Sequence, residues 1–370
     1  EPIVTVRAKV MEAQFIETML LLSINHQSLI ATKANRVVTA ANGRVVMDLG
    51  ARRGQGADAA ILGARAAIIG GCVGTSNVYT GELFDIPIKG THAHSWVMHF
   101  DDELTAFRAY ADVYPDGCLL LVDTYDTLKS GVPNAIKVFR ELREKGYEPV
   151  GIRLDSGDLT YLSREARKML DAAGFENAKI FASGDLDEEV IWELKAQGAK
   201  IDMWGVGTKL ITSDNRPALG GVYKLSAEID KDGTVTPKIK ISDNINKVTN
   251  PGKKIFRIYD KKNGKALADL IALDYEQIDT EKPLTIFDPV QTWKQMTIEN
   301  YFVKELLVPI FINGRQVYCS PQLKEISAFA QKEFETFWCE YVRLKNPQVY
   351  KVDLSQELYD LKQRLLKERK

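Results

Sequence analysis

Short apolar runs alternate with longer amphipathic stretches between about residue 37 and residue 206. The apolar runs are rich in Val, Ile and Leu, and a cluster of Gly, Asp, Ser or Thr follows most of them. Such runs are typical of buried parallel strands, and the amphipathic stretches are typical of helices. The predicted strands are residues 44–49, 69–73, 86–89, 118–122, 149–154, 178–182 and 201–206. The alternation predicts an α/β fold with a parallel sheet.

The spacing of the predicted strands indicates how this sheet closes. They recur at short intervals, and no long insertion interrupts the series. The connecting helices are clearly signalled: Leu159 and Leu162 begin an apolar face in residues 158–173, and Gly174 ends that run. We therefore expect an irregular TIM-like βα barrel over residues 37–220 rather than an open sheet.

The pattern changes after residue 220. Apolar and polar positions alternate with period two in residues 221–228, 237–242, 254–260, 266–273 and 284–287, with Asp-Gly, Asn-Pro-Gly and Lys-Asn-Gly turns among them. This alternation predicts an antiparallel β subdomain over residues 221–300. Residues 301–370 are predicted to be a charged helical segment, and residues 1–36 a strand and helices that lead into the barrel. The apolar run 19–24 is too short to span a bilayer and is expected to be a buried helix face.

Composition excludes several classes of protein. The 370 residues include 49 Lys and Arg and 50 Asp and Glu, so the net charge is −1. No overall field would attract nucleic acid or an anionic membrane, and we expect neither as a partner. The four cysteines, at positions 72, 118, 319 and 339, lack metal-ligand spacing. Cysteines spaced in this way fit a reducing, cytoplasmic location best.

The sequence begins at Glu1 without a methionine, and we expect an upstream part of the natural chain to be missing.

Polar clusters follow the predicted strands, where a barrel carries its active site. Arg52 and Arg53 follow the first strand and suit a multiply charged anion. Asp123 and Asp155 follow later strands and are able to bind Mg²⁺ or accept from ribose hydroxyls. Gly-rich turns at 183–185 and 205–208 offer backbone N–H groups to a phosphate. Together they predict a site for a magnesium-bound phosphorylated sugar. Neither turn is a Walker A or dinucleotide motif.

Two histidines, His92 and His94, follow the predicted strand 86–89. In an extended stretch they would point the same way, which permits an HxH metal site. That site needs further histidines after later strands, and the sequence has none after residue 99. The role left for one of the pair is nucleophile or general base.

Five ordered motifs give the chain a family resemblance. They are Asp-Leu-Gly-Ala-Arg-Arg at 48–53, Gly-Thr-His-Ala-His-Ser at 90–95, Val-Asp-Thr-Tyr-Asp-Thr at 122–127, Arg-Leu-Asp-Ser-Gly-Asp at 153–158 and Gly-Val-Gly-Thr at 205–208. In this order and spacing the chain resembles nicotinate phosphoribosyltransferase, a type II phosphoribosyltransferase, over its whole length. The resemblance implies a homodimer that makes nicotinate mononucleotide and pyrophosphate from nicotinate and phosphoribosyl pyrophosphate in NAD salvage. It also implies Mg²⁺, and ATP as a co-substrate hydrolysed through a phosphohistidine.

The resemblance also assigns roles by position. His94 resembles the phosphorylated histidine, while Asp123 and Asp155 match acids that hold ribose hydroxyls or magnesium pyrophosphate. Arg153 matches an arginine near the pyridine carboxylate. The other substrate-binding positions carried over are Arg52, Arg53, Ser183, Gly184, Asp185, Gly205, Gly207 and Thr208.

Alternatives remain open at this point. A sister enzyme acting on nicotinamide differs in substrate by one charge, and one acting on quinolinate would lack the His94 motif. Leu49 replaces a phenylalanine that stacks on the base in some relatives, so one face of the ring is unaccounted for. Relatives also carry an N-terminal part before the position of Glu1. A truncated, non-catalytic phosphosugar-binding homologue is therefore the remaining alternative.

Overall fold

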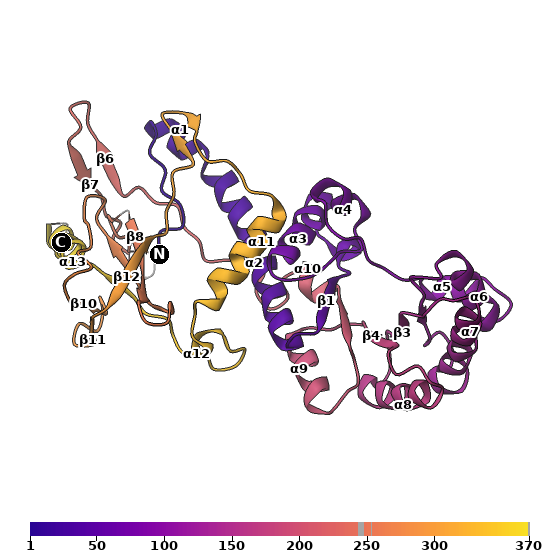
Figure 1. Cartoon of the computed structure of the whole chain (residues 1–370). Helices are drawn as coiled ribbons and strands as arrows, with labels where there is room; N and C mark the ends of the chain where they lie inside the picture. Colours follow the sequence, from indigo (N-terminus) through magenta and orange to yellow (C-terminus); the bar gives the residue numbers. More distant parts are fainter. Residues whose placement is uncertain (243–247, 253, 369–370) are drawn as a thin grey trace. The chain divides into compact units, whose positions relative to one another are not determined.

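The computed structural model describes residues 1–242, 248–252 and 254–368. The chain divides into two compact units (Figure 1). The α/β unit comprises Ile24–Leu219 and Leu323–Ala330, and the β unit comprises Glu1–Ser23, Gly220–Gln322 and Gln331–Lys370. The alternation of apolar runs and amphipathic stretches thus falls in the α/β unit, and the period-two alternation in the β unit.

A parallel sheet forms the centre of the α/β unit. Its strands are β1 (Val45–Asp48), β2 (Leu119–Leu121), β3 (Gly151–Leu154), β4 (Lys179–Ala182) and β5 (Met203–Val206), in the order β1-β5-β4-β3-β2. Met47, Leu119 and Phe181 form a buried cluster in this sheet. Trp204 is also fully buried and lies on β5, the strand between β1 and β4. Burial on both faces explains why these strands appear in the sequence as continuous apolar runs.

Helices connect the strands of the α/β unit. They are α2 (Glu17–Ala41), η1 (Ala51–Arg53), α3 (Ala57–Ile69), α4 (Val78–Phe84), α5 (His94–Met98), α6 (Glu103–Val113), η2 (Thr127–Gly131), α7 (Val132–Glu144), α8 (Leu159–Ala172), α9 (Glu188–Ala196), α10 (Thr208–Ile211) and the first part of α11 (Leu323–Glu335). The predicted helix 158–173 is confirmed as α8. The Asp158 carboxylate caps it by accepting from the Tyr161 N–H at 2.9 Å. Figure 1 shows α7 and α8 beside the β3–β4 part of the sheet.

Two predicted strands of the α/β unit are wrong. Residue 69 ends α3, and the run 69–73 continues into a turn. In the run 86–89 only Ile88 pairs, through an isolated parallel bridge to Thr75, which in turn bridges to Asp48. Pro87 lacks a backbone N–H, so this segment cannot supply a full ladder. The strand ladders described here therefore show a parallel sheet.

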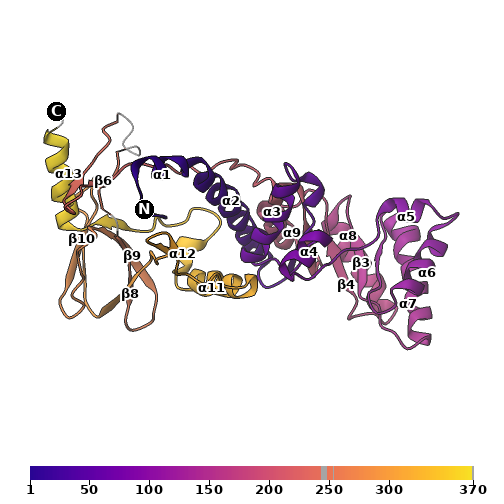
Figure 2. The same ribbon diagram turned by 90° about the horizontal axis from the view of Figure 1, so that it is seen from above.

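Short antiparallel sheets make up most of the β unit. Its strands are β6 (Ala227–Ile229), β7 (Val235–Pro237), β8 (Lys254–Asp260), β9 (Ala266–Ala272), β10 (Leu284–Phe287), β11 (Gln295–Ile298), β12 (Tyr301–Glu305), β13 (Phe311–Ile312), β14 (Arg315–Gln316) and β15 (Val352–Leu354). The main sheet has the order β12-β8-β9-β15, in which β15 runs parallel to β9. The helices of this unit are α1 (Val10–Phe15), α12 (Cys339–Val342) and α13 (Gln356–Glu368), besides the parts of α2 and α11 that fall in it. Figure 2 shows α13 beside these strands, where Leu358 packs on Ile271 and Leu273.

The predictions for the β unit hold in part. Strands 254–260, 266–273 and 284–287 are confirmed as β8, β9 and β10, whereas β6 and β7 lie closer to the Asp-Gly turn than predicted. The segment 301–370 is not uniformly helical, because it contains β12 to β15. Aromatic and β-branched residues at 301–303 and the Asn-Gly turn at 313–314 favour strands there. Residues 243–247, 253, 369 and 370 lie outside the described residues.

The predicted buried face at residues 19–24 is also wrong. Met19 is 65% exposed and Leu22 is 58% exposed, and the buried positions of α2 begin at Leu29. The later part of α2 meets α3 closely: a Cβ built on Gly70 would lie 2.6 Å from the Cβ of Ala34. Among the described residues, no helix combines the length and apolar character needed to cross a membrane.

Candidate active site

A cavity of about 280 Å³ opens at the carboxyl ends of β1, β3, β4 and β5. Every substrate-binding residue predicted from the sequence lines it, together with Asp155 and Leu49. The lining residues are Leu49, Arg52, Arg53, Arg153, Asp155, Ser183, Gly184, Asp185, Gly205, Gly207 and Thr208. The parallel strands explain this convergence, since their carboxyl ends meet at one edge of the sheet.

Two arginines lie at the cavity mouth. Arg52 and Arg53 lie on η1, directly after β1, and both are exposed. Within the described part of the chain, neither forms an ion pair with a carboxylate. Two such guanidinium groups are suited to a ligand with several negative charges.

Arg153 lies deeper in the cavity and is held on three sides. It projects from β3, and its Nε donates to Ser183 Oγ at 2.8 Å. One terminal nitrogen donates to Thr91 Oγ1 at 2.7 Å, and the other to Asp155 Oδ1 at 2.8 Å. Its side chain is only 17% exposed. These contacts fix the plane of the guanidinium group.

Like Asp185, Asp155 lines the cavity. Its Oδ1 accepts from Arg153 and from the Ser183 hydroxyl, whereas no hydrogen bond to Oδ2 is found among the described residues. Burial by itself would raise the pKa of Asp155, but the bonds from Ser183 and Arg153 outweigh it and lower the pKa. The carboxylate therefore stays ionised, with one oxygen available to a ligand or cation.

His94 and Asp123 form a pair adjoining the cavity. Nε2 of His94, at the start of α5, lies 3.1 Å from Oδ1 of Asp123. The other oxygen of Asp123 accepts from the Asp155 backbone N–H at 2.8 Å and from the Ser156 hydroxyl at 2.7 Å. The Asp123 side chain is 3% exposed, and that of His94 is 38% exposed. The histidine is thus oriented by a buried carboxylate and remains open to a reactant.

His92 does not share this environment, contrary to the sequence prediction that the two histidines point the same way. It is buried, and its Nε2 accepts from the Leu121 N–H at 3.1 Å. The ring meets Tyr110 edge-on, with centroids 4.7 Å apart. The extended stretch ends at residue 93 and α5 begins at His94, so the two side chains have different partners. His92 is a core residue that supplies a hydrogen-bond acceptor to the edge strand β2.

The environment of His92 predicts a pH-dependent stability. Burial lowers the pKa of His92 from 6.5 to about 4, and the positive Arg153 acts in the same direction. As pH falls from 6.5 towards 4, the unfolded chain takes up a proton that the folded chain refuses, so the free energy of unfolding should fall by about 3 kcal/mol. In His92→Gln the amide oxygen accepts from Leu121 without titrating. Chemical denaturation at several pH values should give a flatter curve for this variant; parallel curves would contradict the assignment.

Glycines allow the backbone to approach closely in the cavity wall. Gly184 has φ +93°, and a Cβ there would lie 2.1 Å from the carbonyl oxygen of Asp155. A Cβ on Gly205 would lie 2.5 Å from both Leu49 and Phe181. No side chain larger than hydrogen fits at either position without displacing its neighbours.

Sequence reasoning missed three residues that hold this site. Thr91 and Ser156 lie inside motifs quoted for the resemblance, but only their contacts show what they do. Asp48 is fully buried at the end of β1, where it accepts from the Gly50 N–H at 2.9 Å and the Thr75 hydroxyl at 2.7 Å. A charged residue ending an apolar run was the available signal for Asp48. It fixes the turn that leads to Arg52.

The described residues contain no cluster of three or more His, Cys, Asp or Glu side chains arranged to hold a metal. A single carboxylate together with substrate phosphates is nevertheless a common way to hold Mg²⁺. Asp155 fits that role through its Oδ2. Asp123 fits it less well, because both of its oxygens already accept hydrogen bonds.

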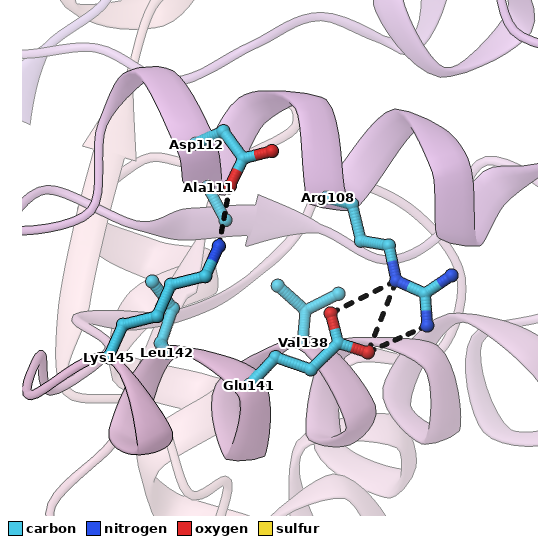
Figure 3. A pocket seen from close by; sticks show the side chains of 7 residues that line it. All are labelled: Arg108, Ala111, Asp112, Val138, Glu141, Leu142 and Lys145. Atoms are coloured by element: carbon cyan, nitrogen blue, oxygen red, sulfur yellow. Dashed lines mark hydrogen bonds and ion pairs between the residues drawn. The ribbon is translucent and has the colours of Figure 1, made fainter.

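A second cavity, of about 120 Å³, lies between α6 and α7 (Figure 3). Arg108 pairs with Glu141 at 2.6 Å and Lys145 with Asp112 at 2.8 Å. Because its charges are matched within the protein, this cavity has no net charge to offer a ligand. The cavity at the strand ends is therefore the candidate active site.

The fold and this cavity define an α/β protein with a site suited to a phosphorylated, multiply negative ligand. The sequence profile of the nicotinate phosphoribosyltransferase (NAPRTase) family matches residues 45–271, and that of the nicotinate phosphoribosyltransferase C-terminal domain matches residues 252–362. Nicotinate phosphoribosyltransferase of Bacillus subtilis is 50% identical over 369 residues, covering 100% of this chain and 75% of that protein. The chain therefore belongs to the nicotinate phosphoribosyltransferase family.

Solved structures agree with this assignment. Human nicotinic acid phosphoribosyltransferase superposes with a TM-score of 0.79 at 29% identity, over 96% of this chain and 77% of that chain. Nicotinate-nucleotide pyrophosphorylase from Pyrococcus furiosus superposes with a TM-score of 0.65 at 26% identity, over 86% and 73%. The arrangement of strands and helices is thus shared with enzymes of pyridine nucleotide chemistry.

Proposed function

We propose that the chain forms nicotinate mononucleotide and pyrophosphate from nicotinate and phosphoribosyl pyrophosphate, with ATP hydrolysis coupled through phosphorylation of His94. The observation that carries this proposal is that one cavity gathers arginines, an ionised aspartate and Gly-rich turns, with the His94–Asp123 pair hydrogen-bonded to its wall.

The proposed chemistry follows from charge. Breaking the anomeric C–O bond leaves positive character on the ribose and negative charge on the departing pyrophosphate. Arg52 and Arg53 would receive the pyrophosphate, while the N–H groups of the turns at 183–185 and 205–208 would receive the sugar and its 5′-phosphate. Mg²⁺, held through Asp155, would neutralise charge on the pyrophosphate. Arg153 would meet the carboxylate of nicotinate.

The proposed role of His94 follows from its hydrogen bond. The Asp123 carboxylate already accepts from a backbone N–H and a hydroxyl, and a carboxylate has no proton to donate. Its bond to His94 must therefore be donated by the imidazole, so Nε2 of His94 carries the proton. In the neutral imidazole, Nδ1 then holds the free electron pair. It would attack the γ-phosphorus of ATP and form an N–P bond as the bond to the ADP oxygen breaks. The phosphorylated ring adds about two negative charges beside Asp155 and the cavity.

Closure of the sheet into an irregular barrel is a further part of the proposal. Bridges through Thr75 and Ile88 extend the β1 edge, and the loop after Ile88 brings His92 to Leu121 on the β2 edge. These contacts support closure through side chains rather than a continuous ladder. We also propose that the chain is organised in four segments with boundaries at residues 36, 220 and 300. We further propose that it forms a homodimer and is located in the cytoplasm.

The decisive experiment compares nicotinate, nicotinamide and quinolinate as substrates. The protein is incubated with phosphoribosyl pyrophosphate and Mg²⁺, with and without ATP, and the mononucleotide is quantified by chromatography. We expect product from nicotinate at the highest rate, with ATP stimulation. Product from another base at a higher rate would reassign the substrate, and no product from any base would favour the non-catalytic homologue.

A further inference from the structure

The hydrogen bonds of Arg153 leave a defined part of its side chain available. A guanidinium group has five N–H donors. Three of them are used, toward Ser183, Thr91 and Asp155. In the described part of the chain the other two have no partner, and they lie one on each terminal nitrogen. Two N–H groups in the plane of a guanidinium match the two oxygens of a carboxylate.

The hydroxyl of Thr91 is oriented by its own loop. It lies 3.1 Å from the carbonyl oxygen of His92, to which it can only donate, since a carbonyl oxygen accepts. The lone pairs of Thr91 Oγ1 are therefore left for Arg153. Ser183 and Asp155 hold the other edge of the same planar group, so without Thr91 Oγ1 the whole guanidinium group can tilt about those two bonds and carry its free N–H groups away from the ligand.

We propose that Thr91 is a positioning residue that sets the preference for a carboxylate over a carboxamide on the pyridine ring. It acts by holding the two free N–H groups of Arg153 toward the cavity. A carboxylate accepts from both. A carboxamide offers one acceptor and one NH₂, so one N–H of Arg153 would face another donor. The inference rests on the proposed function, in which Arg153 meets the nicotinate carboxylate.

The position of Thr91 also joins the base site to the proposed phosphorylation site. Thr91 precedes His94 by three residues on one loop, and His94 binds Asp123, which accepts from the backbone of Asp155. Asp155 in turn binds Arg153. These hydrogen bonds form a ring that is closed by the chain between residues 91 and 94. A displacement of the loop at His94 would thus move Thr91 and alter its hydrogen bond with Arg153.

The test compares kcat and KM for nicotinate and nicotinamide in Thr91→Val, which keeps the shape of the side chain, and Thr91→Ser, which keeps the hydroxyl. In Thr91→Val we expect KM for nicotinate to rise about tenfold and kcat to change by about twofold at most, so that selectivity over nicotinamide falls about tenfold. Thr91→Ser should keep the wild-type ratio. Thr91→Ala is a second hydroxyl-free variant in case valine prevents folding, and it should behave like Thr91→Val.

The matched control is Thr285→Val, which removes an exposed hydroxyl bonded to Thr297 in the β unit and should change nothing. Wild-type selectivity in both hydroxyl-free variants, or equal loss in Thr91→Ser, would overturn the inference. Arg153→Lys separates the two levels. If this substitution leaves KM for nicotinate unchanged, the proposed role of Arg153 fails; if it raises KM while Thr91→Val does not, only the role of Thr91 fails.

Discussion

His94→Ala should lose ATP-coupled turnover, by about a hundredfold or more, while slow ATP-independent formation of nicotinate mononucleotide persists. Alanine removes the only atom in the proposal that accepts the phosphoryl group, but it leaves the cavity lining in place, because His94 does not line the cavity. The measurement is the rate of ADP and mononucleotide formation with and without ATP, together with the KM for phosphoribosyl pyrophosphate.

His99→Ala is the matched control for this prediction. His99 follows the same short helix, is exposed and contacts the ring of Phe100. The control should keep ATP stimulation. A His94→Ala protein that still couples ATP hydrolysis to product formation at the wild-type ratio would show that another residue carries the phosphoryl group. Mass spectrometry of the wild-type protein after incubation with ATP should locate the modification.

Gly184→Ala should lower kcat/KM by about a hundredfold and reduce the free energy of unfolding by about 1–3 kcal/mol. A methyl group at this position would lie 2.1 Å from the carbonyl oxygen of Asp155, and the backbone there has φ +93°. The clash displaces the segment that carries the Asp155 carboxylate and its bond to Arg153. Steady-state kinetics and denaturant unfolding measure the two effects.

Gly198→Ala separates backbone strain from this clash. Gly198 has a similar φ of +82°, and no atom lies within 4 Å of a Cβ built there. It should therefore lose stability to the same order without losing activity. Equal losses of activity in the two variants would mean that strain, rather than displacement of Asp155, explains the effect of Gly184→Ala.

Local patterns were sufficient where a single property decides the structure. Strands β3, β4 and β5 are buried on both faces, so each appears as an apolar run, and the predicted boundaries lie within a few residues of the observed ones. The prediction failed where pairing partners decide. Residues 69–73 and 86–89 also contain short apolar stretches, yet the first continues a helix into a turn and the second pairs at Ile88 alone.

The candidate site divides in the same way. Sequence placed Arg52, Asp155 and Gly184 at strand ends, and parallel topology brought them to one cavity. It did not separate His92 from His94, because burial depends on what packs around each ring. The Tyr110 ring and the Leu121 N–H contact His92, whereas His94 is hydrogen-bonded to Asp123.

The sequence by itself determined the α/β class, the family resemblance and the residue types of the site. These follow from periodicity and from motifs that are local in the chain. Only the tertiary structure decided which donors of Arg153 are occupied, which oxygen of Asp155 is free, and that Thr91 joins the histidine loop to the base site. Those facts depend on distances between residues that are far apart along the chain: Thr91 and Arg153 are separated by 62 positions and meet at 2.7 Å.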